Sequence, residues 1–300
     1  MATAREIRRR IRSVKNISKV TGALEAVSAS KVRRAQNAAT ASRAYSNAAF
    51  SVLTDLGRLQ GGDLSHPLLD EPEQVNNILV ILITSDRGLA GPYNTNILRV
   101  ALDFEKEQNV PVSYLTVGKK GRDLLLRRGR NIIAEFTNMP DPPNISDVTP
   151  VTRAAKDEFF SGRVDEVYVA YTNFINTLRQ EPTIERMLPL RPGESEISAG
   201  GQETQVSSGP EAVYTFEPSV DLILDEILPR FSELVLYQAI LESLASEHSA
   251  RMVAMRNATE NASALVDDLT LDYNKARQLA ITSEILDIVG GAEALAQSEE

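Results

Sequence analysis

One stretch near the C-terminus, residues 219–289, constrains the fold more than any other part of the chain. Apolar residues recur there at alternating steps of three and four from Leu224 to Ala280, and only Gln238, His248 and Thr259 interrupt them with polar side chains. A pattern that persists over so many turns predicts one long helix whose apolar seam lies against another helix. The C-terminal segment 219–300 is therefore predicted to be a coiled-coil helix.

The ends of this helix have their own signals. The pair Gly290-Gly291 is a typical helix stop, and Pro229 predicts a kink or a later start of the helix. From Pro229 to Val289 the helix would be roughly 90 Å long, several times the diameter of a small domain. A helix of that length requires a partner.

The N-terminal segment 1–62 supplies a candidate partner. Thr3 and Glu6 have the spacing of a capping box, so a helix is expected to begin at Thr3. Small residues follow after Lys31, and glycines from Gly57 onward are expected to end the helix. Its expected seam consists of Ile7, Ile11, Val14, Ile17, Val20, Leu24 and Val27.

The charges of the two ends are opposite although the whole chain carries a net charge of −9. Residues 5–34 contain ten basic and two acidic residues (10 − 2 = +8), whereas residues 211–300 contain five basic and seventeen acidic residues (5 − 17 = −12). We expect the two helices to pair antiparallel, with charge attraction between them. A nucleic-acid role for the basic end is not favoured, because it lacks interleaved aromatic residues and any recognisable binding motif.

Between the two helices, segment 63–218 has a different pattern. The continuous apolar run Ile78–Ile83 is typical of a buried parallel strand, and further expected strands at 112–117, 131–136 and 166–171 alternate with expected helices at 93–108, 119–128 and 148–160. This alternation predicts an inserted Rossmann-like α/β domain with a mainly parallel sheet. The fold class is thus α/β plus long α.

The rest of this domain is less regular. Segment 172–190, which contains two prolines, is expected to be an edge strand or an arm crossing the sheet. Segment 191–209 is rich in Gly, Ser and Glu and is expected to be a mobile loop. Segment 212–218 alternates apolar residues and is expected to form a short strand or a turn before the final helix.

The chain offers no constellation for catalysis, cofactor binding or metal binding. It has no cysteine and two histidines, which makes a Cys- or His-based metal site implausible. The loop 84–92 follows the first strand, where a nucleotide phosphate would bind, but it contains neither glycine-rich phosphate-binding fingerprint. An enzyme acting on a nucleotide or phosphate ester, with helical arms for oligomerisation, remains an alternative that needs a phosphate at Ser85–Gly91.

Several motifs together resemble the gamma subunit of F-type, proton-driven ATP synthases, from one end of the chain to the other. They are REIRRRIRSVKNISKVTGALEAVSASKVRRAQ at the start, TSDRGLAGPYN after the first strand, FINTLRQEPTIERMLPL in the arm, and SEHSARMVAMRNAT with YNKARQ in the final helix. The resemblance implies a non-catalytic rotor shaft that couples rotation of the proton-driven c ring to conformational changes at the catalytic beta subunits. It also implies a nucleotide-free α/β domain beside the epsilon subunit and the c ring, and a peripheral location on the cytoplasmic face of the bacterial cell membrane.

The resemblance also implies which residues touch which partner. Contacts with the beta subunit are expected at Arg277, Gln278, Thr282, Glu284, Arg251 and Leu24, and the bearing region is expected at 17–31. The alpha subunits of the catalytic hexamer are expected partners as well. Contacts with the c ring and the epsilon subunit are expected at Tyr214, Phe216 and Glu217. Gly22 and Leu24 depart from the family pattern, as does Pro229. A glycine inside a helix costs about 1 kcal/mol relative to alanine, so Gly22 bears on local stiffness.

Overall fold

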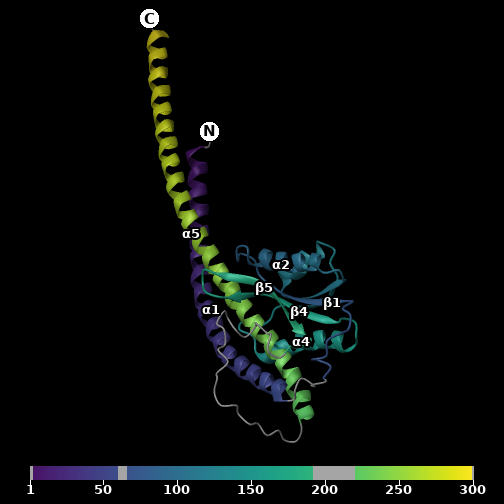
Figure 1. Ribbon diagram of the computed structural model, residues 1–300. Coiled ribbons are helices and arrows are strands. Elements are labelled where there is room, and N and C mark those ends of the chain that lie inside the picture. Colours follow the sequence, from purple (N-terminus) through teal and green to yellow (C-terminus); the bar gives the residue numbers. More distant parts are fainter. Residues whose placement is uncertain (1–2, 60–65, 192–219, 299–300) are drawn as a thin grey trace. The chain divides into compact units, whose positions relative to one another are not determined.

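The computed structural model describes residues 3–59, 66–191 and 220–298 (Figure 1). Two long helices bracket an α/β region, as predicted: α1 (Ala4–Leu59) comes first and α5 (Val220–Ser298) last. Between them lie β1 (Ile78–Ile83), α2 (Tyr93–Glu107), β2 (Val112–Val117), α3 (Lys119–Leu126), β3 (Ile132–Phe136), α4 (Ile145–Phe160), β4 (Glu166–Phe174) and β5 (Gln180–Leu188).

The chain forms two compact units. Unit 1 comprises Met1–Val27 and Met252–Glu300, and unit 2 comprises Ser28–Arg251. The division therefore crosses both long helices in sequence, whereas the predicted domains 1–62, 63–218 and 219–300 place boundaries at their ends. Each unit is described separately below.

Unit 2 is built on a five-stranded sheet with the order β3-β2-β1-β4-β5. Strands β1 to β4 pair in parallel, and β5 pairs antiparallel with β4 at one edge. The mainly parallel sheet is thus confirmed, and segment 172–190 contains the predicted edge strand. However, Thr172 to Phe174 belong to β4, which is longer than its apolar run indicated.

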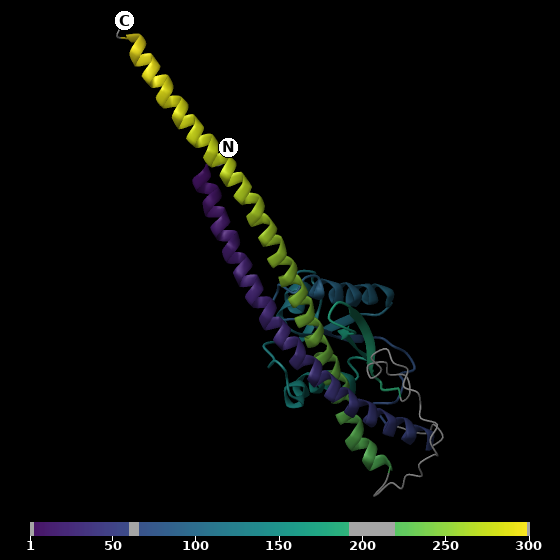
Figure 2. The same cartoon turned by 90° about the vertical axis from the view of Figure 1, so that its left-hand side faces the viewer.

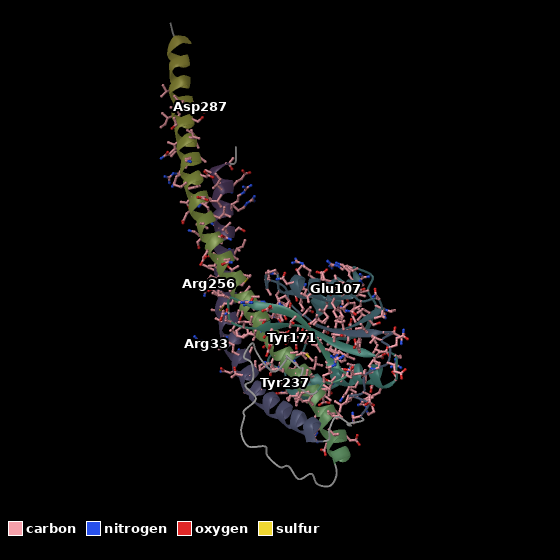
Figure 3. All side chains as sticks on the ribbon, in the orientation of Figure 1. Arg33, Glu107, Tyr171, Tyr237, Arg256 and Asp287 are labelled. Atoms are coloured by element: carbon pink, nitrogen blue, oxygen red, sulfur yellow. The ribbon has the colours of Figure 1, made fainter. Side chains whose placement is uncertain are left out.

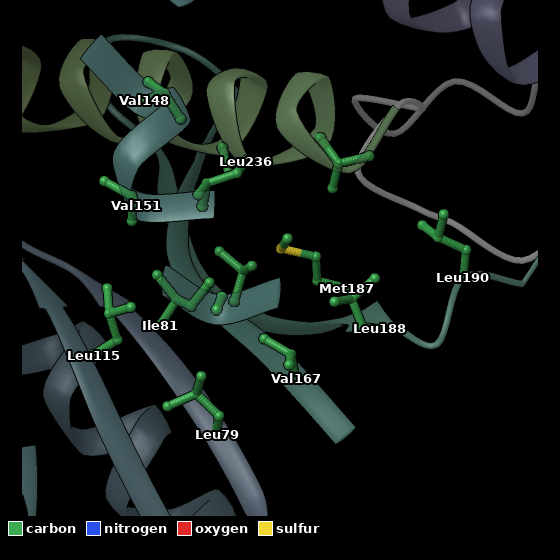
Figure 4. Packing of buried hydrophobic residues seen from close by; sticks show 14 of the residues in the cluster. Leu79, Ile81, Leu115, Val148, Val151, Val167, Met187, Leu188, Leu190 and Leu236 are labelled. Atoms are coloured by element: carbon green, nitrogen blue, oxygen red, sulfur yellow. The ribbon is translucent and has the colours of Figure 1, made fainter. Parts of the chain in front are cut away.

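Alternate side chains of β1 face the two layers of unit 2. Leu79, Ile81 and Ile83 pack with α4 and with the part of α5 from Leu224 to Ile240 (Figure 4). Ile78, Val80 and Leu82 pack on the other face with α2 and α3. Because both faces are covered, every residue of β1 is buried, which explains its uninterrupted apolar sequence.

Two glycines allow close contact between β1 and the segment that follows β2. Gly118 has φ +98°, and a Cβ built on it would lie 2.2 Å from the carbonyl oxygen of Thr84. At Gly121 a Cβ would lie 2.7 Å from the Thr84 hydroxyl, which accepts a hydrogen bond from the Gly121 amide at 2.8 Å. Neither contact was foreseen from the sequence, because both depend on distances between strands.

In unit 1 the N-terminal part of α1 and the C-terminal part of α5 lie side by side and antiparallel (Figure 2). The Thr21 and Thr259 hydroxyls are 2.7 Å apart, and Arg256 donates to Glu25 at 2.9 Å. A later residue of α1 thus contacts an earlier residue of α5, which shows that the two helices run antiparallel. The predicted antiparallel pairing is confirmed. The capping box is also present, since the Thr3 amide donates to Glu6 at 3.0 Å.

Several expectations about helix ends were wrong. The final helix continues through Gly290-Gly291 to Ser298, past the expected stop. Its start at Val220 agrees with the predicted segment 219–300, and the later start that Pro229 could have caused is not observed. A helix does not have to stop at glycine, which only lowers helix propensity. The last described residue of α1 is Leu59, which lies within the predicted segment 1–62. The helix α4 begins at Ile145, earlier than the expected residue 148, because a capping box between Asn144 and Asp147 closes its first turn.

The expected seam of the first helix was also partly wrong. Ile17, Val20 and Val27 are 53%, 59% and 53% exposed, whereas Thr21 and Ser28 are buried in their respective units. Ile7 of the expected seam is buried, and Ile11, Val14 and Leu24 are half-buried. The packed face of α1 combines these residues with the small residues Thr21 and Ser28, which the apolar pattern does not mark. The apolar residues beside that face remain accessible.

The expected charge attraction takes an unexpected form. In the described part of unit 1, the ion pair that links the helices joins a cation of α5, Arg256, to an anion of α1, Glu25. The net charges of the two segments had suggested the opposite arrangement, with cations on α1 and anions on α5. The excess positive charge of α1 is therefore not matched by direct pairs with α5 among the described side chains.

Candidate interaction surfaces

The carboxyl edge of the sheet in unit 2 is the place where a Rossmann-like domain would bind a nucleotide. Here α5 contacts that edge. The Tyr93 hydroxyl donates to the Ser243 carbonyl at 3.2 Å, the Thr172 amide donates to the Ser243 hydroxyl at 3.1 Å, and the Ser246 hydroxyl donates to the Thr172 carbonyl at 3.0 Å. Burial raises the pKa of the Tyr93 phenol well above its ordinary value. The protein's own helix thus provides polar partners at this edge.

The loop after β1 is held by internal contacts as well. The Asp86 carboxylate accepts the amides of Lys119 at 3.1 Å and Asn138 at 2.8 Å, and the Ser85 amide donates to the Asn94 side chain at 3.0 Å. These polar groups serve the packing of the loop. In this described loop, no observed contact favours the alternative function, an enzyme that binds a phosphate at Ser85–Gly91.

Arg251 fastens this same loop to α5. Its guanidinium donates to the carbonyls of Arg87 at 3.3 Å and Gly88 at 3.2 Å, and to Glu247 at 2.7 Å. The side chain is only 12% exposed. In unit 2 Arg251 therefore acts as an internal anchor, and its expected contact with a beta subunit stays a prediction.

A second cluster joins α1, the segment before α4, and α5 within unit 2. The Asp141 carboxylate accepts Lys31 at 2.6 Å and lies 3.1 Å from Nε2 of His248, whose side chain is 4% exposed. Because Arg251 can only donate toward Nδ1 of His248, at 3.4 Å, the imidazole proton lies on Nε2 and is donated to Asp141. Hydrogen bonds from His248 and Lys31 hold the pKa of Asp141 well below its ordinary value.

Replacing Asp141 by asparagine is expected to lower the free energy of unfolding by about 1–2 kcal/mol at pH 7, since the charged acceptor is lost and its side chain is partly exposed. The folded-state pKa is depressed, so this stabilisation is fully present above the ordinary carboxyl pKa of about 4 and declines progressively as pH falls from there through the folded-state pKa. Urea unfolding of the wild-type and Asp141→Asn chains at pH 7 and pH 3 would test this, with the exposed Asp70→Asn as control. An equal difference at both pH values would contradict the assignment.

The three polar residues in the apolar pattern of α5 all form hydrogen bonds. Gln238 lies near the Ala39 carbonyl at 3.5 Å, His248 contacts Asp141, and Thr259 contacts Thr21. Polar groups at seam positions fix the register between helices, since a slipped register would leave them unsatisfied. His66, in the segment before β1, is buried and its Nε2 lies 3.3 Å from the Asp225 carboxylate of α5.

The end of α5 in unit 1 is exposed on every side. Side chains from Arg277 to Gly291 are all exposed, because the seam with α1 ends near Ala276. The exposed apolar residues of this region are Leu279, Ile281, Ile285, Leu286, Ile288 and Val289. At 100° per residue these side chains cover about half of the helix circumference, and an exposed apolar face of that width indicates a binding surface for another protein.

The predicted contact residues are brought together only in part. Arg277, Gln278, Thr282 and Glu284 lie on this exposed end of α5, where the Arg277 guanidinium carbon lies 5.9 Å from the centre of the Tyr273 ring. Leu24 is half-buried on α1 in unit 1. Tyr214, Phe216 and Glu217 lie outside the described residues, as does the predicted loop 191–209 apart from Arg191, and as does segment 212–218. Figure 3 shows the labelled Arg256 and Asp287 on α5.

Among the described residues, no cluster of three or more potential metal ligands is found. In the same part of the chain, no helix is both long enough and apolar enough to cross a membrane. The observed features are two long helices, an α/β region whose carboxyl edge contacts α5, and a bare apolar helix end. They define a class of protein that acts by binding and positioning other subunits.

Comparison with known proteins gives the family. The family model described as ATP synthase matches residues 3–295. The chain is 48% identical over 297 residues to the ATP synthase gamma chain of Dehalococcoides mccartyi strain CBDB1, covering 99% of this chain and 100% of that one. It is 49% identical over 306 residues to the gamma chain of Herpetosiphon aurantiacus, covering 99% and 100% respectively. The chain therefore belongs to the family of ATP synthase gamma chains, non-catalytic subunits that form the central stalk of the complex.

Solved structures share the fold. The rotor of the Euglena gracilis mitochondrial ATP synthase matches with a TM-score of 0.63 at 19% identity, covering 93% of this chain and 98% of that one. The central stalk and c-ring structure of the Tetrahymena thermophila enzyme matches with a TM-score of 0.60 at 21% identity, covering 80% and 99%. The resemblance stated from the sequence is thus confirmed.

Proposed function

We propose that this chain turns as the shaft of its ATP synthase, with the α/β domain toward the c ring and the exposed end of α5 inside the ring of alpha and beta subunits. The observation that carries the proposal is the end of α5 beyond Ala276, where every residue as far as Gly291 is exposed and the large apolar side chains cover about half of the helix circumference. An exposed apolar surface of this extent marks a site where another protein binds. A sleeve of subunits around a single helix provides that cover.

The α/β domain has a mechanical role in this account. The domain is anchored to α5 through Thr172 of β4, through Tyr93 of α2 and through the Gly88 carbonyl, to which Arg251 of α5 donates. Force applied to the domain therefore reaches the helix through several contacts at once. The partners are the alpha, beta and epsilon subunits and the c ring, with Tyr214, Phe216 and Glu217 as the contacts to epsilon and the c ring. The chain is peripheral to the cytoplasmic face of a bacterial membrane through the complex.

Arg277 and Gln278 are the residues we propose to act on the beta subunits. They are adjacent on α5 and exposed, so they present a guanidinium fork and an amide over an arc of about 100°. Arginine suits this role because its planar fork can hold two acceptors of one loop. Thr282 and Glu284 extend the surface along the same helix.

Replacing Arg277 and Gln278 together by alanine is expected to lower ATP turnover of the assembled enzyme at least several-fold, because each charged contact is worth on the order of 1.5–3 kcal/mol. Assembly and the helical content of the isolated chain are expected to stay nearly unchanged. Turnover at saturating ATP and circular dichroism provide the two readouts. The exposed pair Asp272 and Lys275 on the same helix, replaced by alanine, is the matched control. Equal turnover in all three enzymes would remove the proposed role.

A further inference from the structure

His248 lies between an anion and a cation in the interior of unit 2. Its Nε2 is 3.1 Å from the Asp141 carboxylate, and its Nδ1 is 3.4 Å from Nη1 of Arg251. The imidazole is buried, and the Arg251 side chain is nearly so. Arginine can only donate hydrogen bonds, so Nδ1 accepts from Arg251, and this contact exists only while the imidazole is neutral.

The charges around this imidazole are balanced. Asp141 accepts from Lys31 of α1 at 2.6 Å, and Arg251 donates to Glu247, its neighbour on α5, at 2.7 Å. Two anions thus stand beside two cations while the imidazole is neutral. Hydrogen bonds from His248 and Lys31 hold the pKa of Asp141 well below its ordinary value, so Asp141 stays an anion throughout the range in which histidine side chains change charge.

A second proton on His248 removes this balance. It binds at Nδ1, the ring nitrogen that carries no proton in the neutral form, and turns the acceptor of Arg251 into a donor. Two cations then face each other away from water, where neither solvent nor salt screens their repulsion well. The contact with Asp141 gains opposite charge and persists, so Arg251 is the group that has to move.

Movement of Arg251 acts on the loop 84–92 after β1. Its guanidinium donates to the backbone carbonyls of Arg87 at 3.3 Å and Gly88 at 3.2 Å. The next residue, Leu89, has φ +64°, a left-handed conformation that residues with a Cβ rarely adopt. Such a residue keeps its strained backbone only while its surroundings hold it there, so loss of the Arg251 contacts favours a relaxed loop.

We propose that His248 is a proton-controlled clasp for the loop 84–92. The neutral imidazole and Arg251 hold the loop in its strained conformation, and uptake of a proton by His248 releases it. The side chains of Arg87 and Leu89 are exposed, so acidification changes a surface of unit 2 that is open to partners. The coupling is reciprocal: a partner that binds the held loop favours the neutral imidazole. The inference rests on contacts within unit 2 and does not require the proposed function.

The test places a nitroxide spin label on the loop of the full chain. The chain has no cysteine, so Arg87→Cys gives a unique attachment site, and the substitution keeps the backbone carbonyl that accepts from Arg251. The electron paramagnetic resonance spectrum measures the mobile fraction of the label at about pH 8 and about pH 5, the two ends of the ordinary histidine range. Circular dichroism at both pH values monitors the fold.

In this labelled chain we expect the mobile fraction to rise about fivefold or more from the higher to the lower pH, with helical content unchanged. His248→Gln is expected to abolish the rise, because glutamine offers one donor to Asp141 and one acceptor to Arg251 but takes up no proton. Arg251→Gln removes the clasp itself. With it we expect a mobile label at both pH values.

The second histidine of the chain provides the matched control. His66 is also buried, its Nδ1 accepts the Leu68 amide at 3.0 Å, and its Nε2 lies 3.3 Å from the Asp225 carboxylate. It thus resembles His248 in burial and in its aspartate partner, but its Nδ1 faces a backbone amide in place of an arginine. His66→Gln is expected to leave the rise in label mobility intact.

Several results would overturn the inference. One is a mobile fraction that stays the same at both pH values in the labelled chain that retains both histidines. Another is an equal rise in His248→Gln, which would assign the pH response to a different group. A rise that comes with loss of helical content would show unfolding of the chain. Should His248→Gln fail to fold, Arg251→Gln decides, because a label that stays immobile there at the higher pH contradicts the clasp.

Discussion

Replacing Gly118 by alanine is expected to destabilise the α/β region by about 4 kcal/mol or more, which would leave little stability in an ordinary domain. Gly118 has φ +98°, a conformation that residues with a Cβ rarely adopt. The new Cβ would meet the carbonyl oxygen and carbon of Thr84 at 2.2 and 2.7 Å. Both atoms belong to the backbone, so no change of side-chain conformation relieves the clash.

Gly118 cannot move away, because its neighbours are fixed on both sides. Its amide donates to the Phe136 carbonyl at 2.8 Å, and the Thr84 amide donates to the Val117 carbonyl at 2.8 Å. Gly129→Ala is the matched control, since Gly129 also has a positive φ, +66°, but nothing lies within 4 Å of its Cβ position. We expect about 1–2 kcal/mol there. Urea unfolding of both variants measures the difference, and an equal loss in the two would contradict the account of this contact.

The second large effect is expected from Leu236→Ala, with a loss of about 2–5 kcal/mol in the free energy of unfolding. Leu236 has no exposed surface and belongs to the buried cluster that joins α5 to α4 and the sheet (Figure 4). Truncation would leave a cavity between helix and sheet in unit 2. Thermal or urea unfolding of the isolated wild-type and Leu236→Ala chains measures this loss in the free energy of unfolding.

Leu279→Ala provides the contrast on the same helix. Leu279 is 62% exposed, so its replacement is expected to change the stability of the isolated chain by less than about 0.5 kcal/mol. The same substitution is expected to matter only when the subunits of the ring cover the helix. A large loss of stability from Leu279→Ala in the isolated chain would show that the end of α5 packs within the chain.

The main elements could be predicted because each rests on a local pattern. The helical period of residues 224–276, the capping box at Thr3 and the apolar run Ile78–Ile83 depend only on neighbours in sequence. The parallel sheet could be predicted for the same reason, because it follows from the alternation of strands and helices along the sequence. The recognised motifs added the family, which the patterns alone do not give.

What could not be predicted depends on contacts between distant segments. The roles of Gly118, His66 and Asp141 arise from neighbours that are far away in sequence. The packed face of α1 was predicted only in part: Ile7 is buried as expected, but Thr21 and Ser28 were missed because small polar residues carry no apolar signal. The helix ends were missed because propensity at Gly290-Gly291 is only a weak constraint.

The central claim is that the chain rotates within a ring of alpha and beta subunits. The chain has no cysteine, so Glu107→Cys, at the exposed end of α2 (Figure 3), gives a unique attachment site for a bead. With the ring immobilised and ATP supplied, the account predicts that the bead turns continuously in one direction, and that it stops when ATP is exhausted. A bead that stays still while the same complexes hydrolyse ATP would contradict it.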